Sequence, residues 1–272
     1  KLSIAYSVVA PTDGSCGDDG LVDVGVYVRT RDLPSGDWSS PERIGAVADH
    51  LQSFRLSGGT IHATVANDKD QHTWYETVKG ATAKRFAIGA AAGPVALRVG
   101  DDGNARIAFE TPKGIAFGTF DGASFATTTV PSSARGWNPV FALASGNVAN
   151  VMWNSSAHGA GCAEPGPDPD DGTWFATNSG GTWQPTKLSD RVGAASITID
   201  PATGEIHALV DDFRALVHFR KPVGEDWTKE LLDTTNASSG ILRVDPVTGR
   251  LVVAYVSMRV DGDDIVMVMS KG

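Results

Sequence analysis

The stretch Ser196–Trp227 reads SITIDPATGEIHALVDDFRALVHFRKPVGEDW, and it contains three short apolar runs separated by turns. A tight turn is indicated at Asp200-Pro-Ala-Thr-Gly204, because Asp, Pro and Gly each favour turn conformations. The turn returns 45 residues later (249 − 204) as Asp245-Pro-Val-Thr-Gly249, followed by the strand-like run LVVAYV. The stretch therefore predicts one unit of a repeated, strand-rich fold.

Turn glycines set the period of this repeat. The intervals are 44, 43, 58 and 45 residues between Gly59, Gly103, Gly146, Gly204 and Gly249. Alternating apolar residues follow each of these glycines, as expected for half-buried strands. Self-similarity near this length is typical of propeller blades, in which four-stranded sheets pack around a centre.

A second marker agrees with the first. An aromatic residue is expected to open the outermost strand of five repeats, at Trp38, Phe86, Phe125, Trp183 and Trp227. We predict an all-β, six-bladed β-propeller forming a single domain over residues 1–272. The repeats are placed at approximately 1–47, 48–90, 91–133, 134–190, 191–235 and 236–272. The first repeat would lack its inner strand and the last its outer strand, and a five-bladed ring completed by the strand near Ile241–Val244 is the alternative.

Composition narrows the range of partners. The net charge is −9 and the isoelectric point is about 5.1, which argues against nucleic acids and anionic membranes, since both reward clustered Lys and Arg. No apolar run approaches the roughly 20 residues that a spanning helix needs, so no membrane span is expected. A glycan or a protein remains as the expected ligand, and the oligomeric state is left open.

The two cysteines lie in the two long connectors of the repeat. The 58-residue interval contains extra residues over 154–172, and the first repeat has a similar excess over 10–20. In a six-fold ring these connectors face each other, so we expect a Cys16–Cys162 disulfide; two unpaired buried thiols are the alternative. A bridge would place the protein in an oxidising compartment, extracellular or periplasmic.

The segment Ala176-Thr-Asn-Ser-Gly-Gly-Thr-Trp183 resembles the Asp-box of sialidase-like (BNR) propellers, Ser-x-Asp-x-Gly-x-Thr-Trp. Gly180, Thr182 and Trp183 match that pattern, whereas Ala176 replaces its Ser and Asn178 its Asp, so the box is degenerate. In that family the box is a structural turn between the third and fourth strands, remote from the catalytic site. The resemblance therefore implies the propeller fold and gives no chemistry.

A sialidase-like activity would need further residues that this sequence does not present in the family's pattern. The resemblance implies an arginine triad, a Tyr with a partner Glu, and an Asp acid/base. The Arg-Ile-Pro entry motif is absent, and Arg55, Arg98 and Arg243 fall near the far end of their innermost strands. Tyr255 occupies a position that is apolar in other repeats and is expected in the core. The catalytic motifs of sialidases are therefore not expected here.

Two other groups of residues could be read as ligands. His62 and His207 occur in the same Ile-His-Ala context, and a repeated structural histidine is the favoured interpretation. Two acidic loops offer oxygen ligands that would suit Ca²⁺, although solvated surface charge is the commoner outcome. These loops contain Asp13, Asp18 and Asp19 in the first repeat, and Asp168, Asp170 and Asp171 in the fourth.

Polar and aromatic residues at the ends of second strands form the candidate ligand site. They are Asn67, Asp68, Glu110, Trp137, Trp153, Asn154, His158, Asp211 and Asp212. Exposed indoles stack on sugar C–H groups while carboxylates and amides bind hydroxyls, although the same set could be unrelated rim residues. We expect an extracellular, non-catalytic propeller that binds a glycan or a protein. The alternative is a glycoside hydrolase with a rearranged site, using Glu110 and Asp211.

Overall fold

The computed structural model describes residues 2–11, 21–32, 35–44, 49–67, 72–80, 82–89, 93–156, 168–211, 215–234, 237–245, 247–258 and 264–271. Regular structure in these residues is almost entirely β-strand, and the two helical segments, Ser145–Asn147 and Ser179–Gly181, are three-residue 3-10 turns. The predicted all-β fold is therefore confirmed. No helix in the described ranges is long and apolar enough to cross a membrane.

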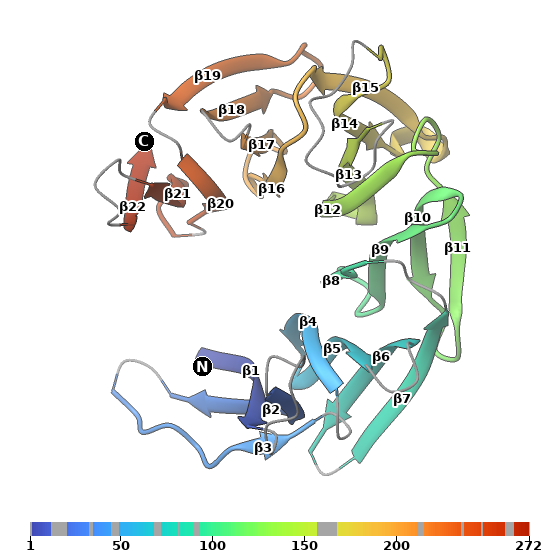
Figure 1. Cartoon of the computed structure of the whole chain (residues 1–272), viewed down its shortest axis with the longest axis vertical. Coiled ribbons are helices and arrows are strands. Elements are labelled where there is room, and N and C mark those ends of the chain that lie inside the picture. Colours follow the sequence, from blue (N-terminus) through green and yellow to red (C-terminus); the bar gives the residue numbers. More distant parts are fainter. Residues whose placement is uncertain are drawn as a thin grey trace. The chain divides into compact units, whose positions relative to one another are not determined.

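The strands form six sheets, and each sheet is built from strands that follow one another in the sequence (Figure 1). The first and last sheets have three strands in the described residues, and the four between them have four each. The chain divides into two compact units, 1–107 with 118–127 and 108–117 with 128–272.

Two sheets lie wholly within the first unit, and they share a core. The first sheet is β1 (Leu2–Pro11), β2 (Leu21–Arg31) and β3 (Glu42–Arg43). The second is β4 (Asp49–Ser57), β5 (Thr60–Asn67), β6 (His72–Lys79) and β7 (Thr82–Gly89). Val26 and Val28 of β2 pack with Ala63 and Val65 of β5, because alternate residues of each strand point to the buried face.

A third sheet contributes residues to both units. Its strands are β8 (Ala96–Val99), β9 (Ala105–Thr111), β10 (Gly114–Phe120) and β11 (Phe125–Thr129). β9 and β10 are almost completely buried, as expected for central strands covered on both faces.

The second unit contains three further sheets. They are formed by β12 (Gly136–Ala144), β13 (Val148–Ser155), β14 (Gly172–Thr177) and β15 (Gln184–Ser189); by β16 (Ala194–Ile199), β17 (Ile206–Asp211), β18 (Leu216–Lys221) and β19 (Thr228–Asp233); and by β20 (Ala237–Val244), β21 (Leu251–Met258) and β22 (Asp264–Lys271). The first strands of the three sheets, β12, β16 and β20, contact one another in order (Figure 1). Met152 and Phe175 of one sheet pack with Ile197 and Ala208 of the next.

The repeated turns have the conformation that the sequence predicts. All five turn glycines have positive φ, between 67° and 77°, which favours glycine over any residue with a Cβ. In the two Asp-Pro-x-Thr-Gly turns the aspartate fixes the loop. Asp200 accepts from the N–H of Ala202 at 2.8 Å and from the hydroxyl of Thr203 at 2.8 Å, and Asp245 accepts from the equivalent groups of its own turn.

The aromatic markers follow the prediction only in part. Phe125 opens β11, and Trp183 and Trp227 directly precede β15 and β19. Phe86, however, is the fifth residue of β7, and Trp38 lies four residues before β3. The expectation for those two residues was wrong, because the lengths of the preceding turn and strand differ between the sheets.

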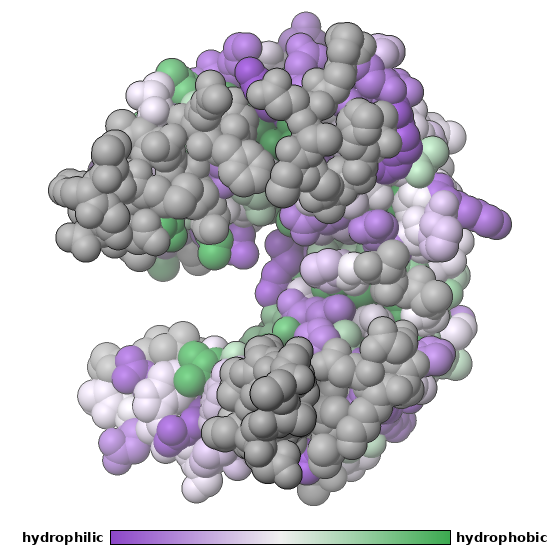
Figure 2. All heavy atoms as spheres, viewed as in Figure 1, coloured by the Kyte–Doolittle hydropathy of each residue, from purple (hydrophilic) through white to green (hydrophobic). Residues whose placement is uncertain are grey.

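Exposed apolar residues are scattered over the surface. On the face seen in Figure 2, green residues form small separate patches among polar ones. The large exposed apolar side chains in the described residues are Ile4, Leu56, Val223, Leu231, Ile241, Val247 and Val268. Apolar residues that are exposed singly are normal for a soluble surface, so a functional site has to be sought in the clefts instead.

Candidate functional site

Each first strand of the second unit carries a β-bulge near its beginning. The pairing of β12 with β13 skips between Trp137 and Val140, so Asn138 is left unpaired in a backbone of φ 50°. The pairing of β16 with β17 skips at Ala195, and that of β20 with β21 skips over Gly240. Bulges re-aim side chains and are over-represented next to functional sites.

The ends of two second strands, β13 and β17, hold the bulge of β16 in place. The N–H groups of Gly193 and Ala194 both donate to the side-chain oxygen of buried Asn154, each at 2.7 Å. The N–H of Asp211 donates to the carbonyl of Gly193 at 2.8 Å. A Cβ at residue 193 would lie 1.8 Å from the carbonyl oxygen of Asp211, so this close approach requires glycine.

A cleft of about 410 Å³ lies at the three bulges, and we call it the bulge cleft. Its size falls within the roughly 300–1,000 Å³ of small-molecule sites. The lining of the bulge cleft includes Trp137, Asn138, Asn154, Ala195, Asp211 and Gly240.

Trp137 is the aromatic component of the bulge cleft. It is half-buried, and its indole N–H is buried without a hydrogen-bond partner in the described residues. The part of the half-buried ring that lines the cleft therefore offers a stacking face, while its N–H group is occluded.

The polar groups of the bulge cleft are few. Asp211 is half-buried and is the one ionisable residue among the described residues that line the cleft. The oxygen of Asn154 is already used by two backbone N–H groups, so its amide nitrogen is the part that can donate to a ligand. The described lining can therefore bind hydroxyl groups, and it presents no cation for an anionic ligand.

Three of the predicted ligand residues, Trp137, Asn154 and Asp211, thus line one cleft. The expectation of an exposed indole at Trp153 was wrong: its side chain is fully buried and stacks on Trp174 with ring centroids 6.4 Å apart. Trp153 lies in the middle of β13, opposite the bulge of β12, where the side chain points into the sheet packing.

The other predicted ligand residues lie elsewhere. Asn67 is buried at the end of β5. Glu110 is half-buried on β9, where burial raises the pKa of its carboxyl group, and it does not line the bulge cleft. Asp68, His158 and Asp212 lie outside the described residues.

The predicted calcium ligands are described for the fourth repeat alone. The guanidinium of Arg135 binds both carboxylate oxygens of Asp168, at 2.7 and 3.0 Å, and lies 3.4 Å from Asp170. Asp171 is buried. No group of three or more His, Cys, Asp or Glu residues in the described ranges is arranged to hold a metal ion. Asp13, Asp18, Asp19, Cys16 and Cys162 lie outside these ranges, so calcium binding and the disulfide stay predictions.

The two repeated histidines have different surroundings. His62 is buried and its Nδ1 lies 2.6 Å from the hydroxyl of Tyr75, in agreement with a structural role. His207 is also largely buried, but it lines a second cleft together with His218. Tyr255 lies in the core as predicted, and its hydroxyl donates to Asp233 at 2.7 Å.

Sequence reasoning missed the bulge residues Asn138, Ala195 and Gly240, and it missed His218. The bulges could not be read from a single strand, because a bulge is defined by its pairing with the neighbouring strand. The Asn-Pro pair at 138–139 was the one local signal, since Asn tolerates positive φ and Pro disrupts regular pairing.

No family model matches the sequence, and no curated relative was found. Solved structures do match. A structure of the Dos1 propeller aligns with a TM-score of 0.55 at 10% identity, over 92% of this chain and 67% of that chain. The α-L-arabinanase of Penicillium chrysogenum, complexed with arabinobiose, aligns with a TM-score of 0.54 at 12% identity, over 99% and 98%. The fold is a β-propeller.

A mutant sialidase of Trypanosoma rangeli that displays trans-sialidase activity also aligns, with a TM-score of 0.54 at 9% identity. The alignment covers 98% of this chain and 52% of the sialidase chain. At these identities the likeness concerns the propeller fold, which glycoside hydrolases and other proteins share. Function has to be argued from the cleft itself.

Proposed function

We propose that this propeller is a non-catalytic binding module that holds a carbohydrate in the bulge cleft. The observation that carries the proposal is the grouping of Trp137 with Asn154 and Asp211 where the bulges of three sheets meet. An indole that stacks on sugar C–H groups, with a carboxylate and an amide for the hydroxyls, is the usual composition of a sugar site.

The charge of the cleft favours a neutral sugar. Its described lining has Asp211 as a single ionisable group, so a carboxylated sugar would bring a second negative charge close to this carboxylate. Neutral pentoses and hexoses would instead stack on Trp137 and donate hydroxyl groups to Asp211. We therefore expect neutral oligosaccharides as the ligand class.

A binding role is also favoured over hydrolysis. Glycosidases that use two carboxylates hold them roughly 5–10 Å apart in one pocket. The described lining of the bulge cleft supplies Asp211, and Glu110 is not part of it. The extracellular or periplasmic setting of such a module depends on the predicted Cys16–Cys162 bridge and stays a prediction.

A glycan array with the purified protein tests the proposal, followed by calorimetric titration of the best neutral oligosaccharide. Trp137→Ala should weaken that affinity about tenfold or more, because it removes the stacking face. Trp38→Ala is the matched control, since Trp38 is a half-buried indole that does not line the cleft and instead packs under Arg31.

Equal losses in Trp137→Ala and Trp38→Ala would remove the bulge cleft as the site. A panel of aryl glycosides covers the alternative. Turnover by the wild type that disappears in Asp211→Asn would replace the binding module by a hydrolase that acts at the same cleft.

A further inference from the structure

Aromatic pairs join successive sheets of this propeller in a repeated geometry. In each pair a residue on the third strand of one sheet meets an aromatic residue at the fourth strand of the following sheet. The pairs are Tyr75–Phe125 at 5.3 Å and 79°, Phe117–Trp183 at 5.5 Å and 73°, and Phe175–Trp227 at 5.0 Å and 79°. Edge-to-face contacts at these distances are favourable beyond the area that they bury.

His218 occupies the corresponding position in the sheet β16–β19. Tyr75 lies opposite Thr64, two residues after His62, and His218 lies opposite Leu209, two residues after His207. The neighbour on the fourth strand is Glu230. The series of third-strand aromatics thus continues here as an imidazole beside a carboxylate.

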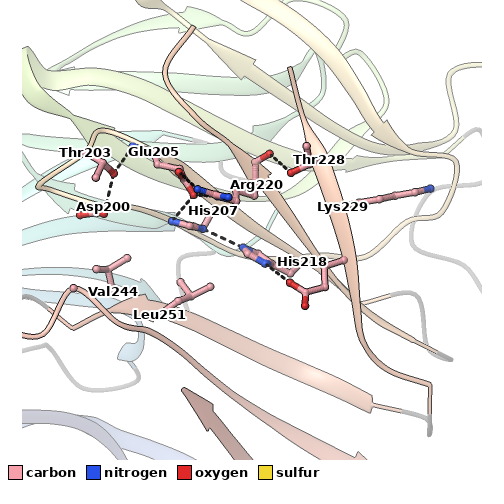
Figure 3. A pocket seen from close by; sticks show the side chains of 12 residues that line it. Asp200, Thr203, Glu205, His207, His218, Arg220, Thr228, Lys229, Val244 and Leu251 are labelled. Atoms are coloured by element: carbon pink, nitrogen blue, oxygen red, sulfur yellow. Dashed lines mark hydrogen bonds and ion pairs between the residues drawn. The ribbon is translucent and has the colours of Figure 1, made fainter. Parts of the chain in front are cut away.

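A cleft of about 420 Å³ lies beside His218, and we call it the histidine cleft. The sheet β16–β19 lines one side with His207, His218 and Glu230, and the next sheet lines the other with Val244 and Leu251 (Figure 3). The cleft therefore opens between two sheets, beside His218. At three other sheet junctions the position that corresponds to His218 holds one ring of an aromatic pair. Among the residues that the structure describes, the histidine cleft shares no lining residue with the bulge cleft.

The two histidines meet edge to edge. Their rings are inclined by 18° with centroids 5.3 Å apart, while Nδ1 of His207 lies 3.1 Å from Nε2 of His218. A centroid separation so much longer than the N···N distance means that the rings lie nearly in one plane. They form a polar wall of the cleft, and Val244 and Leu251 line the side opposite (Figure 3).

The described lining of the histidine cleft has one more carboxylate than cations. The carboxylates are Asp200, Glu205 and Glu230, and the cations are Arg220 and Lys229. Arg220 is engaged by Glu205 in a two-pronged ion pair, with one contact at 2.8 Å, and the side chain of Lys229 extends away from the histidines (Figure 3). Burial lowers the pKa of His207, so it adds no charge at neutral pH. The half-exposed Glu230 carboxylate, 3.9 Å from His218, faces the cleft.

We propose that the histidine cleft binds an aromatic amine, with its ring between the His207–His218 wall and Val244–Leu251 and its ammonium group at Glu230. This site is independent of the proposed sugar site. The ring of the ligand would pack against the apolar side chains of Val244 and Leu251. Its ammonium group would be attracted by the excess of carboxylates in the described lining. An aromatic side chain of a peptide has a similar ring but no amine attached to it, so it would lack the contact with Glu230.

Calorimetric titration with tryptamine, indole-3-acetate and ethylamine tests the proposal, because these probes separate the ring from the charge. Tryptamine should bind, indole-3-acetate should bind at least about tenfold more weakly, and ethylamine should give no measurable heat. Equal binding of tryptamine and indole-3-acetate, or no binding of tryptamine at millimolar concentration, would overturn the proposal.

Variants locate the site. Glu230→Gln should weaken tryptamine binding about tenfold, whereas Glu225→Gln, an exposed carboxylate outside the lining of the cleft, should leave it unchanged. Val244→Trp should fill the cleft and abolish binding, with near-ultraviolet circular dichroism as the check on folding. Trp137→Ala should retain full tryptamine affinity. Unchanged affinity in Glu230→Gln, or a loss in Trp137→Ala, would contradict this site.

Discussion

The second and fifth sheets carry the same tripeptide, Ile-His-Ala, at residues 61–63 and 206–208, and they use it differently. His62 meets the hydroxyl of Tyr75, whose ring is fully buried among Phe86, Phe120 and Phe125. His207 meets His218, in a cleft lined by ionisable side chains. The histidine is the same in both sheets. The third-strand residue that its ring contacts, Tyr75 or His218, decides whether this strand position belongs to the core or lines a cleft.

This comparison gives a general lesson about repeated folds. A motif that recurs at one strand position indicates the backbone geometry of the repeat, because the geometry is what the repeats share. It does not indicate the chemistry of that position. The chemistry depends on cross-strand neighbours, which differ from sheet to sheet and lie 11 to 13 residues away in the sequence.

The largest expected effect separates the two third-strand residues. Tyr75→Ala should lower the free energy of unfolding by about 4 kcal/mol, because it empties a fully buried aromatic position. His218→Ala should cost about 1–2 kcal/mol, since the neighbouring cleft admits water and the site can relax. Urea denaturation followed by tryptophan fluorescence measures both values, and similar losses would mean that the two positions are equally part of the core.

A smaller effect concerns the pH dependence of stability. Burial lowers the pKa of both His62 and His207 from the ordinary value of 6.5, and Glu205 partly offsets this for His207. The unfolded chain then binds more protons than the folded one, so stability is lost as the pH falls through 6.5. Replacing either histidine by Gln should flatten the decline between pH 7 and 5.

Urea midpoints at pH 7, 6 and 5 measure this decline in each variant, with His72→Gln, an exposed histidine on β6, as the control. A decline as steep in both variants as in the wild type would show that neither buried histidine contributes to the pH dependence of stability.

The smallest expected effect concerns the ion pair that the second sheet lacks. Arg220 lies opposite His207, where the second sheet has Thr77 opposite His62. The hydrogen bond from Arg220 is the main cause of a lowered pKa of Glu205. A carboxyl with a lowered pKa stabilises the fold above its ordinary pKa and loses that contribution as the pH falls.

Arg220→Ala should therefore lower the free energy of unfolding only slightly at pH 7, because Arg220 is more than half exposed and solvent screens its ion pair. The difference from wild type should shrink as the pH falls through the lowered pKa of Glu205. Arg250→Ala, an exposed arginine outside the described lining of both clefts, is the matched control. A difference that does not change with pH would point to lost packing of the arginine stem.

The sequence was sufficient to predict the strand-rich repeat, because its turns depend on local chemistry. Asp200 and Asp245 bind their own turn residues, and the five turn glycines adopt the same positive φ. Local signals of this kind need no knowledge of the neighbouring sheet. The outer aromatics were predicted less well, since Trp38 and Phe86 depend on the lengths of individual connections.

The candidate site was predictable in its residue types and less so in its arrangement. Trp137, Asn154 and Asp211 were identified from their places at strand ends, and they line one cleft. Trp153 was misplaced because its exposure depends on a bulge in the partner strand. The histidine cleft was missed for the same reason: His218 gains its surroundings from β17, β19 and the following sheet.

The three bulges at the bulge cleft have a consequence for protein engineering. Gly193 and Gly240 have no room for a side chain, because an added Cβ would lie 1.8 Å and 2.4 Å from its nearest neighbours. Ala195, between them, already carries a Cβ and lines the cleft. Residue 195 is thus the position at which a library of side chains can retune ligand preference while the strand pairing that shapes the cleft is kept.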